Sequence, residues 1–299
     1  MRVTVLAGGP SSEREISLES GAAVADACVR LGHDVFKADV MPNDTAALDR
    51  PCDIVFPVLH GPFGEDGTLQ ALLEERTLRY VGSDSAASRR CMDKHLSKQC
   101  WNDVGLPTAP WVMVSASDAS AAEAVQPPVV VKPTGEGSSV GVVLADTMED
   151  VRRAVEHALM RFDRILVEKR LTGREVTVGI LGDRVLPIVE VRPAKGFYDF
   201  EAKYRRNDTE YIVEPDLDQT TVRQLQALAL RAYRVLGCRH YGRVDLILDA
   251  SAGPQLLEIN TVPGFTQHSL LPKAAARVGI GFDALVGTLL ALGMSDANA

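Results

Sequence analysis

Several features that would assign this chain to a common class of protein are missing from its sequence. The five cysteines form no CxxC pair and show no metal-ligand spacing, so neither a zinc site nor a disulfide framework organises the fold. An odd number of scattered cysteines fits a reducing compartment. No apolar run approaches the ~20 residues that cross a bilayer, and there is no signal peptide or internal repeat. We therefore expect a cytoplasmic protein without a membrane segment.

Two nucleotide-binding fingerprints are also absent. The glycine pair after the first predicted strand, at residues 8–10, does not match GxGxxG, which disfavours a nicotinamide-dependent dehydrogenase. The glycine-rich run at residues 134–141 lacks the GxxxxGK[ST] order of a Walker A loop. The net charge of −8 argues against nucleic acid and anionic membranes as partners. With 299 residues, 46% of them hydrophobic, the chain can build two or three domains.

The chain divides by pattern into three segments. Residues 1–83 read as a parallel α/β domain, with strands expected at 3–7, 34–38 and 53–59 around a helix. Residues 84–167 combine helices with strands around a glycine-rich loop, and residues 168–299 hold further strands and hairpins, a long irregular segment at 192–210 and a helical tail. A loop as long as 192–210 inside a compact domain is typical of a lid or a binding loop.

The first segment holds two candidate functional features. Ser12 and Glu15 form a capping-box pattern at the start of the helix, and Glu13 lies in its first turn, where the helix macrodipole favours an acid. From the residues alone, that structural role for Glu13 is the favoured one. The loop 60–67 carries three glycines, an Asp and a Glu, and it begins with His60 at the carboxyl end of a strand, where α/β proteins bind ligands. A surface turn would explain the glycines but not the histidine.

The middle segment carries lysines beside a glycine-rich loop. A helix is expected over residues 85–104, with Lys94 and Lys98 one turn apart; most lysines so placed are solvated. A strand then ends at Lys132, and residues 134–141 follow as a loop of glycines and hydroxyls. Such a loop presents backbone N–H groups and hydroxyls to an anion, which indicates a lid over nucleotide phosphates. A plain hairpin loop is the alternative, because glycine and serine are ordinary turn residues.

The last segment contains the most informative stretch, a hairpin with its turn at residues 249–254. Its apolar side chains would share one face of the sheet: Val244, Leu246, Leu248, Leu257 and Ile259. Because strand side chains alternate, the other face would then carry Arg243, Asp245, Glu258 and Asn260. If Leu248 lies opposite Gln255, Asp245 falls directly opposite Glu258, and Arg243 opposite Asn260.

Two carboxylates directly opposite on a sheet repel each other. A hard divalent cation removes that conflict, and carboxylate and amide oxygens suit Mg²⁺, which completes its shell with water and substrate phosphate. The alternative is a solvated hairpin face on which Arg243 neutralises the two acids.

Taken in order, these pieces resemble the D-alanine–D-alanine ligase family of the ATP-grasp superfamily. The resemblance rests on GGPSSEREIS, HGPFGEDGTLQ, VKPTGEGSSVG, GFYDFEAKY, GRVD and LEINTVPG, at residues 8–17, 60–70, 131–141, 196–204, 242–245 and 257–264. These runs follow the family order over essentially the whole chain. The resemblance implies a mixed α/β, three-domain ATP-grasp fold, with domains at 1–83, 84–167 and 168–299 and with ATP between the last two.

The resemblance also implies roles for individual residues. For ATP these are phosphate contacts from Lys94, Lys132, Ser139 and Lys203, adenine contacts from Glu168, Lys169 and Leu171, and a ribose contact from Glu175. Two Mg²⁺ ions, or Mn²⁺ in their place, would be held by Asp245, Glu258 and Asn260. The first D-alanine would contact Glu13, Ser138, Tyr204 and His60. Arg243 and the Gly264 N–H would stabilise the oxyanion, and Ser269 and Leu270 would contact the carboxylate of the second D-alanine.

The implied activity is the ATP-dependent joining of two D-alanines through a D-alanyl phosphate, for peptidoglycan precursors, by a homodimer. A related ligase that takes D-lactate or another second substrate is the alternative within the enzyme class. Tyr204 favours D-alanine, because depsipeptide-forming members of the family carry Phe at the matching position. A non-catalytic nucleotide-binding protein on the same fold would lack a metal ligand or a lysine, and no such position is lost here.

Overall fold

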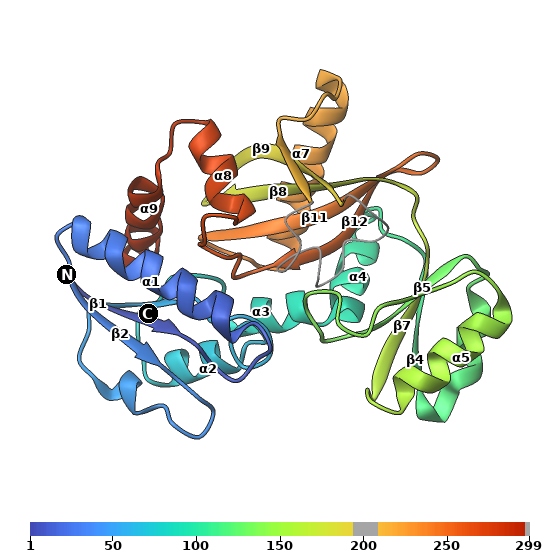
Figure 1. Ribbon diagram of the computed structural model, residues 1–299, viewed down its shortest axis with the longest axis horizontal. Coiled ribbons are helices and arrows are strands. Elements are labelled where there is room, and N and C mark those ends of the chain that lie inside the picture. Colours follow the sequence, from blue (N-terminus) through green and yellow to red (C-terminus); the bar gives the residue numbers. More distant parts are fainter. Residues whose placement is uncertain (194–208, 297–299) are drawn as a thin grey trace.

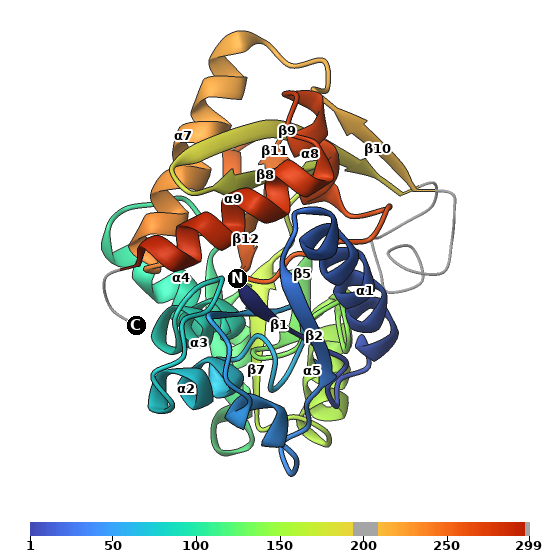
Figure 2. The same ribbon diagram turned by 90° about the vertical axis from the view of Figure 1, so that its left-hand side faces the viewer.

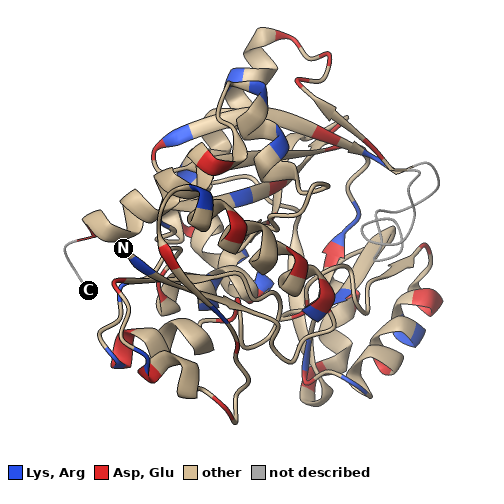
Figure 3. Ribbon diagram, turned by 60° about the vertical axis from the view of Figure 1, so that its left-hand side comes forward, with Lys and Arg blue, Asp and Glu red and all other residues tan. Residues whose placement is uncertain are grey.

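The computed structural model describes residues 1–193 and 209–296. Within these ranges the strands form a three-stranded, a four-stranded and a five-stranded sheet. Figure 1 shows the three-stranded sheet and the four-stranded sheet at opposite ends of the molecule, with the five-stranded sheet above and between them. Basic and acidic residues are interspersed along the elements (Figure 3).

The first sheet is parallel, as predicted, in the order β2-β1-β3. Its strands are β1 (Arg2–Ala7), β2 (Asp34–Asp39) and β3 (Ile54–Pro57), and its helices are α1 (Arg14–Arg30), η1 (Ala46–Asp49) and α2 (Thr68–Glu75). The predicted capping box is wrong. Helix α1 begins at Arg14 with Glu13 at the N-cap, and no side chain caps it. The hydroxyl of Ser11 instead accepts the Glu13 N–H at 3.2 Å, and the turn it forms delays the helix past Ser12.

The single helix predicted over residues 85–104 is broken into α3 (Ser85–Met92) and α4 (Lys94–Asp103). Asp93 lies at the break in an extended conformation, and its carboxylate accepts the N–H groups of His95 and Leu96 at 2.9 and 3.2 Å. An aspartate that caps the second helix in this way stabilises a new helix start, which periodicity alone does not reveal.

The four-stranded sheet has the order β4-β7-β5-β6 and is antiparallel. It contains β4 (Trp111–Ser115), β5 (Val129–Pro133), β6 (Val143–Ala145) and β7 (Arg164–Lys169), with η2 (Ala116–Ala124) and α5 (Met148–Leu159). Helix α5 starts at Thr147, whose hydroxyl accepts the Asp150 N–H. The glycine-rich loop connects β5 to β6, so it is a hairpin loop by topology; whether it also covers phosphates is a separate question.

The five-stranded sheet has the order β10-β9-β8-β11-β12. Its strands are β8 (Gly173–Leu181), β9 (Arg184–Arg192), β10 (Glu210–Val213), β11 (Tyr241–Asp249) and β12 (Gly253–Asn260); its helices are α7 (Gln219–Val235), α8 (Leu270–Arg277) and α9 (Phe282–Ser295). Asp218 caps α7 by accepting the N–H groups of Thr220 and Thr221.

The predicted hairpin register holds at one end and shifts at the other. Asp245 lies opposite Glu258, and Arg243 opposite Asn260, as predicted, but Leu248 lies opposite Pro254 rather than Gln255. The register shifts after Asp245, where Leu257 is left as the extra residue of a β-bulge.

The bulge changes which side chains enter the core. Leu256 is completely buried, whereas Leu257 and Leu248 are only half-buried. The prediction that Leu257 and Leu248 join the buried apolar set was therefore wrong. On β12 the bulge puts Leu256 rather than Leu257 on the buried face. Leu248 lies on β11 near the hairpin turn, where the strand is only half-buried.

One hydrophobic cluster joins the first and last parts of the chain. Phe265 packs against Phe56 of β3 and Tyr241 of β11, with ring centroids 5.6 Å apart in both pairs. Helices α8 and α9 belong to the same cluster, and α9 packs beside α1 (Figure 2). Within the described residues no single helix is long and apolar enough to span a membrane; α8 and α9 pass that test only as a pair bent by 104°.

Candidate active site

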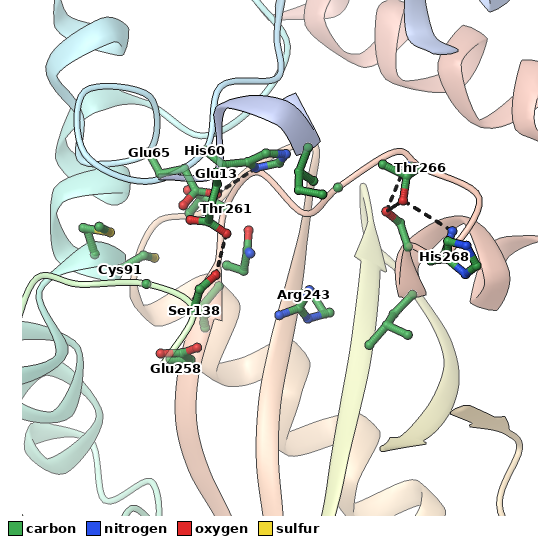
Figure 4. A pocket seen from close by; sticks show the side chains of 18 of the residues that line it. Glu13, His60, Glu65, Cys91, Ser138, Arg243, Glu258, Thr261, Thr266 and His268 are labelled. Atoms are coloured by element: carbon green, nitrogen blue, oxygen red, sulfur yellow. Dashed lines mark hydrogen bonds and ion pairs between the residues drawn. The ribbon is translucent and has the colours of Figure 1, made fainter. Parts of the chain in front are cut away.

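A cavity of about 600 Å³ lies where the three sheets meet, between the start of α1, the loop after β3, the glycine-rich loop and the end of the β11–β12 hairpin. Ten of the residues predicted from the sequence line it: Glu13, His60, Lys94, Ser138, Arg243, Glu258, Asn260, Gly264, Ser269 and Leu270. Figure 4 labels Glu13, His60, Ser138, Arg243 and Glu258 among them. These positions come from all three segments of the chain, so folding brings them to one space.

The glycine-rich loop reaches the start of α1 through Ser138. The Ser138 hydroxyl donates a hydrogen bond to Glu13 Oε1 at 2.5 Å, although the two residues are 125 positions apart. Both side chains are buried. Ser138 has a φ of 50°, in the left-handed region that few non-glycine residues adopt, so the loop holds it in a strained conformation. The structural role that the sequence favours for Glu13 does not explain a carboxylate turned into a cavity and fixed by this hydroxyl.

His60 and Glu65 form a buried pair on the wall of the cavity. Nδ1 of His60 lies 3.4 Å from Glu65 Oε1, and Glu65 Oε2 accepts the Gly61 N–H at 3.0 Å. Burial would lower the pKa of His60, but the carboxylates of Glu65 and Glu13 raise it above its usual value. Burial raises the pKa of Glu65. Both shifts act in the same direction, because each raises the pKa of its group and so favours the protonated form of the pair beside Glu13.

Each carboxylate of the hairpin face has a cation beside it. Arg243 donates two hydrogen bonds to Asp245, both at 2.8 Å, and Lys94 Nζ lies 3.2 Å from Glu258 Oε2. The side-chain oxygen of Asn260 accepts the Val262 N–H at 2.9 Å. The arginine thus neutralises one acid, as in the alternative interpretation of this face, while Glu258 faces the cavity and Asp245 does not line it.

The donor set of the hairpin face nonetheless fits a hard cation. Two carboxylates and one amide oxygen from adjacent strands are the ligand types that Mg²⁺ prefers. Among the described residues no group of three or more His, Cys, Asp or Glu is placed to hold a metal ion. Such a metal would therefore depend on the amide of Asn260, water and the substrate for the rest of its shell.

The residues predicted to contact adenine and ribose, and two of the predicted phosphate contacts, Lys132 and Ser139, lie outside the lining of this cavity. Lys132, at the end of β5, is buried, and its Nζ lies 2.5 Å from Glu168 Oε1 on β7. Lys169 donates to the carbonyls of Gln126 and Pro127. Three other predicted contacts, Ser139, Leu171 and Glu175, also lie outside the lining.

Burial alone would raise the pKa of the Glu168 carboxyl, but two facing lysines outweigh it. Lys132 and Lys98 hold this pKa down to about 2. Glu168 is thus ionised throughout the physiological pH range, in contact with two ammonium groups.

The start of α8 forms the opposite wall of the cavity. Ser269 is the N-cap residue of α8, and its hydroxyl accepts the Thr266 N–H at 2.9 Å. A Cβ added to Gly264 would come within 2.7 Å of Ser269 Oγ, so this wall tolerates only glycine at position 264 without rearrangement. Backbone N–H groups at the start of a helix suit a carboxylate.

The structure adds residues that sequence reasoning missed. Glu65 and Lys273 line the cavity, and Lys98 contacts Glu168 Oε2 at 3.0 Å. The spacing of Lys98 from Lys94 was the available signal, but surface exposure is the usual fate of such lysines, whereas this one is fully buried. Two predicted residues, Lys203 and Tyr204, lie outside the described residues.

A parallel sheet, two antiparallel sheets and a central cavity lined by carboxylates, cations and hydroxyls fit the ATP-grasp fold, which the structural neighbours share. The family described as "D-ala D-ala ligase C-terminus" matches residues 100–291, and "D-ala D-ala ligase N-terminus" matches residues 33–83. The chain belongs to the D-alanine–D-alanine ligase family and is a ligase. The predicted family and ATP-grasp fold are confirmed, while the domain boundaries stay a prediction.

The similarity to curated relatives extends over nearly the whole chain. It is 42% identical over 294 residues to the D-alanine–D-alanine ligase of Hydrogenovibrio crunogenus, covering 97% of this chain and 94% of that protein. It is 45% identical over 290 residues to the D-alanine–D-alanine ligase of Alcanivorax borkumensis, covering 97% and 92%.

Solved structures show the same fold. The D-alanine–D-alanine ligase of Bacillus anthracis complexed with ATP matches with a TM-score of 0.84 at 28% identity, covering 98% of this chain and 97% of that chain. The VanG D-Ala:D-Ser ligase of Enterococcus faecalis matches with a TM-score of 0.88 at 26% identity, covering 98% and 99%.

Proposed function

We propose that this protein joins two D-alanine molecules into D-alanyl-D-alanine. ATP is the co-substrate, and ADP and phosphate are the other products. The observation that carries the proposal is the cavity itself. In it, the Glu13–Ser138 pair, the Glu258–Lys94 pair, Arg243 and the start of α8 face one space of about 600 Å³. The relatives named as D-alanine–D-alanine ligases and the neighbour complexed with ATP support the choice of substrates.

The chemistry requires a carboxylate to become an electrophile. We assign the ammonium of the first D-alanine to Glu13, which Ser138 orients, so that its carboxylate points toward the hairpin face. Phosphorylation by ATP gives a D-alanyl phosphate, and Lys94 and Lys132 offset the charge of the transferring phosphoryl group. Mg²⁺, when bound by Asp245, Glu258 and Asn260, adds further positive charge at that point.

The second half of the reaction needs an amine and an oxyanion site. The second D-alanine is positioned by its carboxylate at Ser269 and the Leu270 N–H, on the wall formed by α8. Its amine attacks the acyl phosphate carbon, and Arg243 with the Gly264 N–H stabilises the oxyanion of the tetrahedral intermediate. Collapse of that intermediate expels phosphate and leaves the peptide bond.

The remaining proposed contacts to ATP and to the first substrate come from residues around the cavity. Adenine and ribose are held by Glu168, Lys169, Leu171 and Glu175, and phosphates also by Ser139 and Lys203. Tyr204 completes the first substrate site with His60.

The domains are 1–83, 84–167 and 168–299. The enzyme acts as a homodimer in the cytoplasm, where it supplies peptidoglycan precursors. Size-exclusion chromatography with light scattering tests the dimer.

A coupled assay of ADP release tests the proposal, with D-alanine, L-alanine and D-lactate offered singly and in pairs. Release with D-alanine alone supports it. The D-Ala:D-Ser neighbour motivates a second candidate with a different acceptor, so D-serine is included. Release that requires D-lactate or D-serine beside D-alanine would favour that second candidate. ADP binding without any turnover would favour a non-catalytic nucleotide-binding protein.

A matched pair of variants tests the site. Glu258→Gln should lower ADP release at least 100-fold, because the carboxylate beside Lys94 is lost. Glu149→Gln, an exposed acid on α5, is the control and should retain full turnover. Equal rates for the two variants would overturn the assignment of Glu258.

A further inference from the structure

Lys98 on α4 is completely buried, and neither the sequence motifs nor the proposed reaction gives it a role. Its ammonium group reaches three oxygen atoms: Thr108 Oγ1 at 2.6 Å, the Ala109 carbonyl at 3.0 Å and Glu168 Oε2 at 3.0 Å. The contacts to Thr108 and Ala109 are hydrogen bonds, whereas the contact to Glu168 Oε2 is an ion pair without hydrogen-bond geometry. The ring of Trp111 lies 5.2 Å from Nζ. A charge this deeply buried is costly unless it is paired and hydrogen-bonded, and Lys98 has one ion pair and two hydrogen bonds.

One side of Lys98 faces the predicted nucleotide residues. Glu168 bridges two lysines, with one oxygen toward Lys132 and the other toward Lys98. All three residues are buried, and together they carry a net positive charge of one. A net positive charge in the interior beside a proposed phosphate contact favours a bound anion. Lys98 therefore contributes to that charge and also fixes the carboxylate that holds Lys132.

The other side of Lys98 reaches the strand that carries the proposed metal ligands. Thr108, which accepts from Lys98, donates its own hydroxyl hydrogen to the Leu256 carbonyl at 2.8 Å. The Leu256 N–H in turn donates to the Pro107 carbonyl at 2.9 Å. These bonds cover the free edge of β12 next to the bulge, two residues before Glu258. Helix α4 lies between the four-stranded and five-stranded sheets in Figure 1, so Lys98 is placed to connect the two sheets.

We propose that Lys98 is a positioning residue. It ties the Lys132–Glu168 pair of one sheet to the edge of β12 in the other sheet, and so sets the placement of the nucleotide contacts relative to Glu258. This inference rests on the proposed function, because it assumes that Lys132 contacts the nucleotide. Lys98 itself touches no substrate.

A purely structural lysine would stabilise the fold without altering the pH dependence of nucleotide binding, and this difference permits a test. The charged groups that face Glu168 are Lys98 from α4 and Lys132 from β5; Trp111, from the adjacent β4, is uncharged. Lys98→Met retains the length of the side chain and removes one of the two cations. The pKa of Glu168 then rises from about 2 toward or above its usual value, because burial is opposed by Lys132 alone.

The experiment measures ADP binding by calorimetry from pH 5.5 to 8.5, together with the melting temperature. The wild-type dissociation constant should change with pH only as far as the terminal phosphate of ADP titrates, at about pH 6. In Lys98→Met the dissociation constant of ADP should be at least tenfold higher than in the wild type at pH 7.5. At the acidic end of the measured range it should also depend on pH through the protonation of Glu168. Lys37→Met, which removes an exposed lysine of β2, is the control for charge and should behave as the wild type. A folded Lys98→Met protein with the affinity and the pH profile of the wild type would overturn the proposal.

A second variant covers the case in which Lys98→Met does not fold. Thr108→Val keeps every charge and the shape of the side chain but removes the hydroxyl that joins Lys98 to Leu256. It should bind ADP within about twofold of the wild type, while kcat for ADP release in the presence of D-alanine falls roughly fivefold or more. An unchanged kcat would overturn the bridging role. Failure of the wild-type protein to bind ADP would refute the proposed function, and the role of Lys98 with it.

Discussion

Asp245 and Glu258 lie directly opposite each other on adjacent strands, and within residues 1–193 and 209–296 a different cation lies beside each carboxylate. Asp245 is held by Arg243 from its own strand, and Glu258 by Lys94 from α4, a helix that precedes it by more than 150 residues in the chain. Like charges opposite each other on a sheet are unfavourable, and here each is balanced by a separate cation. The two strands can therefore present two acids to one site while the protein remains stable.

The hydrogen bond from Ser138 to Glu13 should matter for the first substrate more than for ATP. Both Ser138→Ala and Ser138→Gly remove the hydroxyl, and a hydrogen bond to a charged group contributes about 1.5–3 kcal/mol. We expect KM for D-alanine to rise roughly tenfold or more in both variants, with KM for ATP within about twofold. Steady-state kinetics at saturating ATP measure this.

The Ser138→Gly variant distinguishes the effect of losing the hydroxyl from the effect of backbone strain. Ser138 has a positive φ, which glycine adopts without strain and alanine does not. If Ser138→Gly had a wild-type KM for D-alanine while Ser138→Ala did not, strain rather than the missing hydroxyl would explain the loss.

Gly264→Ala should impair the second half-reaction. The added methyl group would lie 2.7 Å from Ser269 Oγ, so Ser269 must move away from the wall of the cavity. We expect kcat/KM for the second D-alanine to fall at least tenfold. Gly281→Ala is the matched control, because a Cβ there meets no atom within 4 Å and its φ of −66° is ordinary. Equal values of kcat/KM for the two variants would show that Ser269 can move to accept the added methyl group without loss of activity.

The β-bulge predicts unequal effects for two adjacent leucines. Leu256→Ala removes a fully buried side chain and should lower the free energy of unfolding by about 2–5 kcal/mol. Leu257→Ala truncates a half-buried side chain and should cost well under half of that. Urea denaturation of both variants gives the comparison. The opposite order would mean that the hairpin has the regular register and no bulge.

The lowered pKa of Glu168 predicts a dependence of stability on acid. The folded-state pKa is about 2, below the usual value of 4.5, so the unfolded chain binds a proton first as the pH falls. The stability that the ionised Glu168 contributes is fully present above pH 4.5 and is lost as the pH falls toward 2. The difference in unfolding free energy between the wild type and Glu168→Gln should therefore shrink between pH 5 and pH 3. For exposed Glu149→Gln the difference should stay near zero throughout.

Local chemistry accounts for the parts of the site that the sequence predicted. The alternation of Arg243, Asp245, Glu258 and Asn260 with apolar residues set their shared face, because side chains in a strand have a period of two. The parallel first sheet followed from the strand–helix–strand order. Signals of this kind lie within one continuous stretch of chain, and the structure confirms them.

The features that the sequence did not reveal depend on contacts between distant segments. Asp93 ends α3 because its carboxylate is used to cap α4, and Leu257 bulges where residues 107–108 pair with the edge of β12. Lys98 is buried because Glu168, 70 residues later, provides its counter-charge. Such outcomes follow from tertiary pairing rather than from local propensity.

The sequence by itself determined the identity of the reactive groups: which strand carries acids, which loop carries glycines and hydroxyls, and to which family the order of these motifs belongs. Only the tertiary structure decided which cation serves which carboxylate, and that Glu13 faces Ser138 across one cavity. The physical reason is that side-chain periodicity acts along the chain, whereas charge pairing and burial act through space and depend on every segment that folds into the same volume.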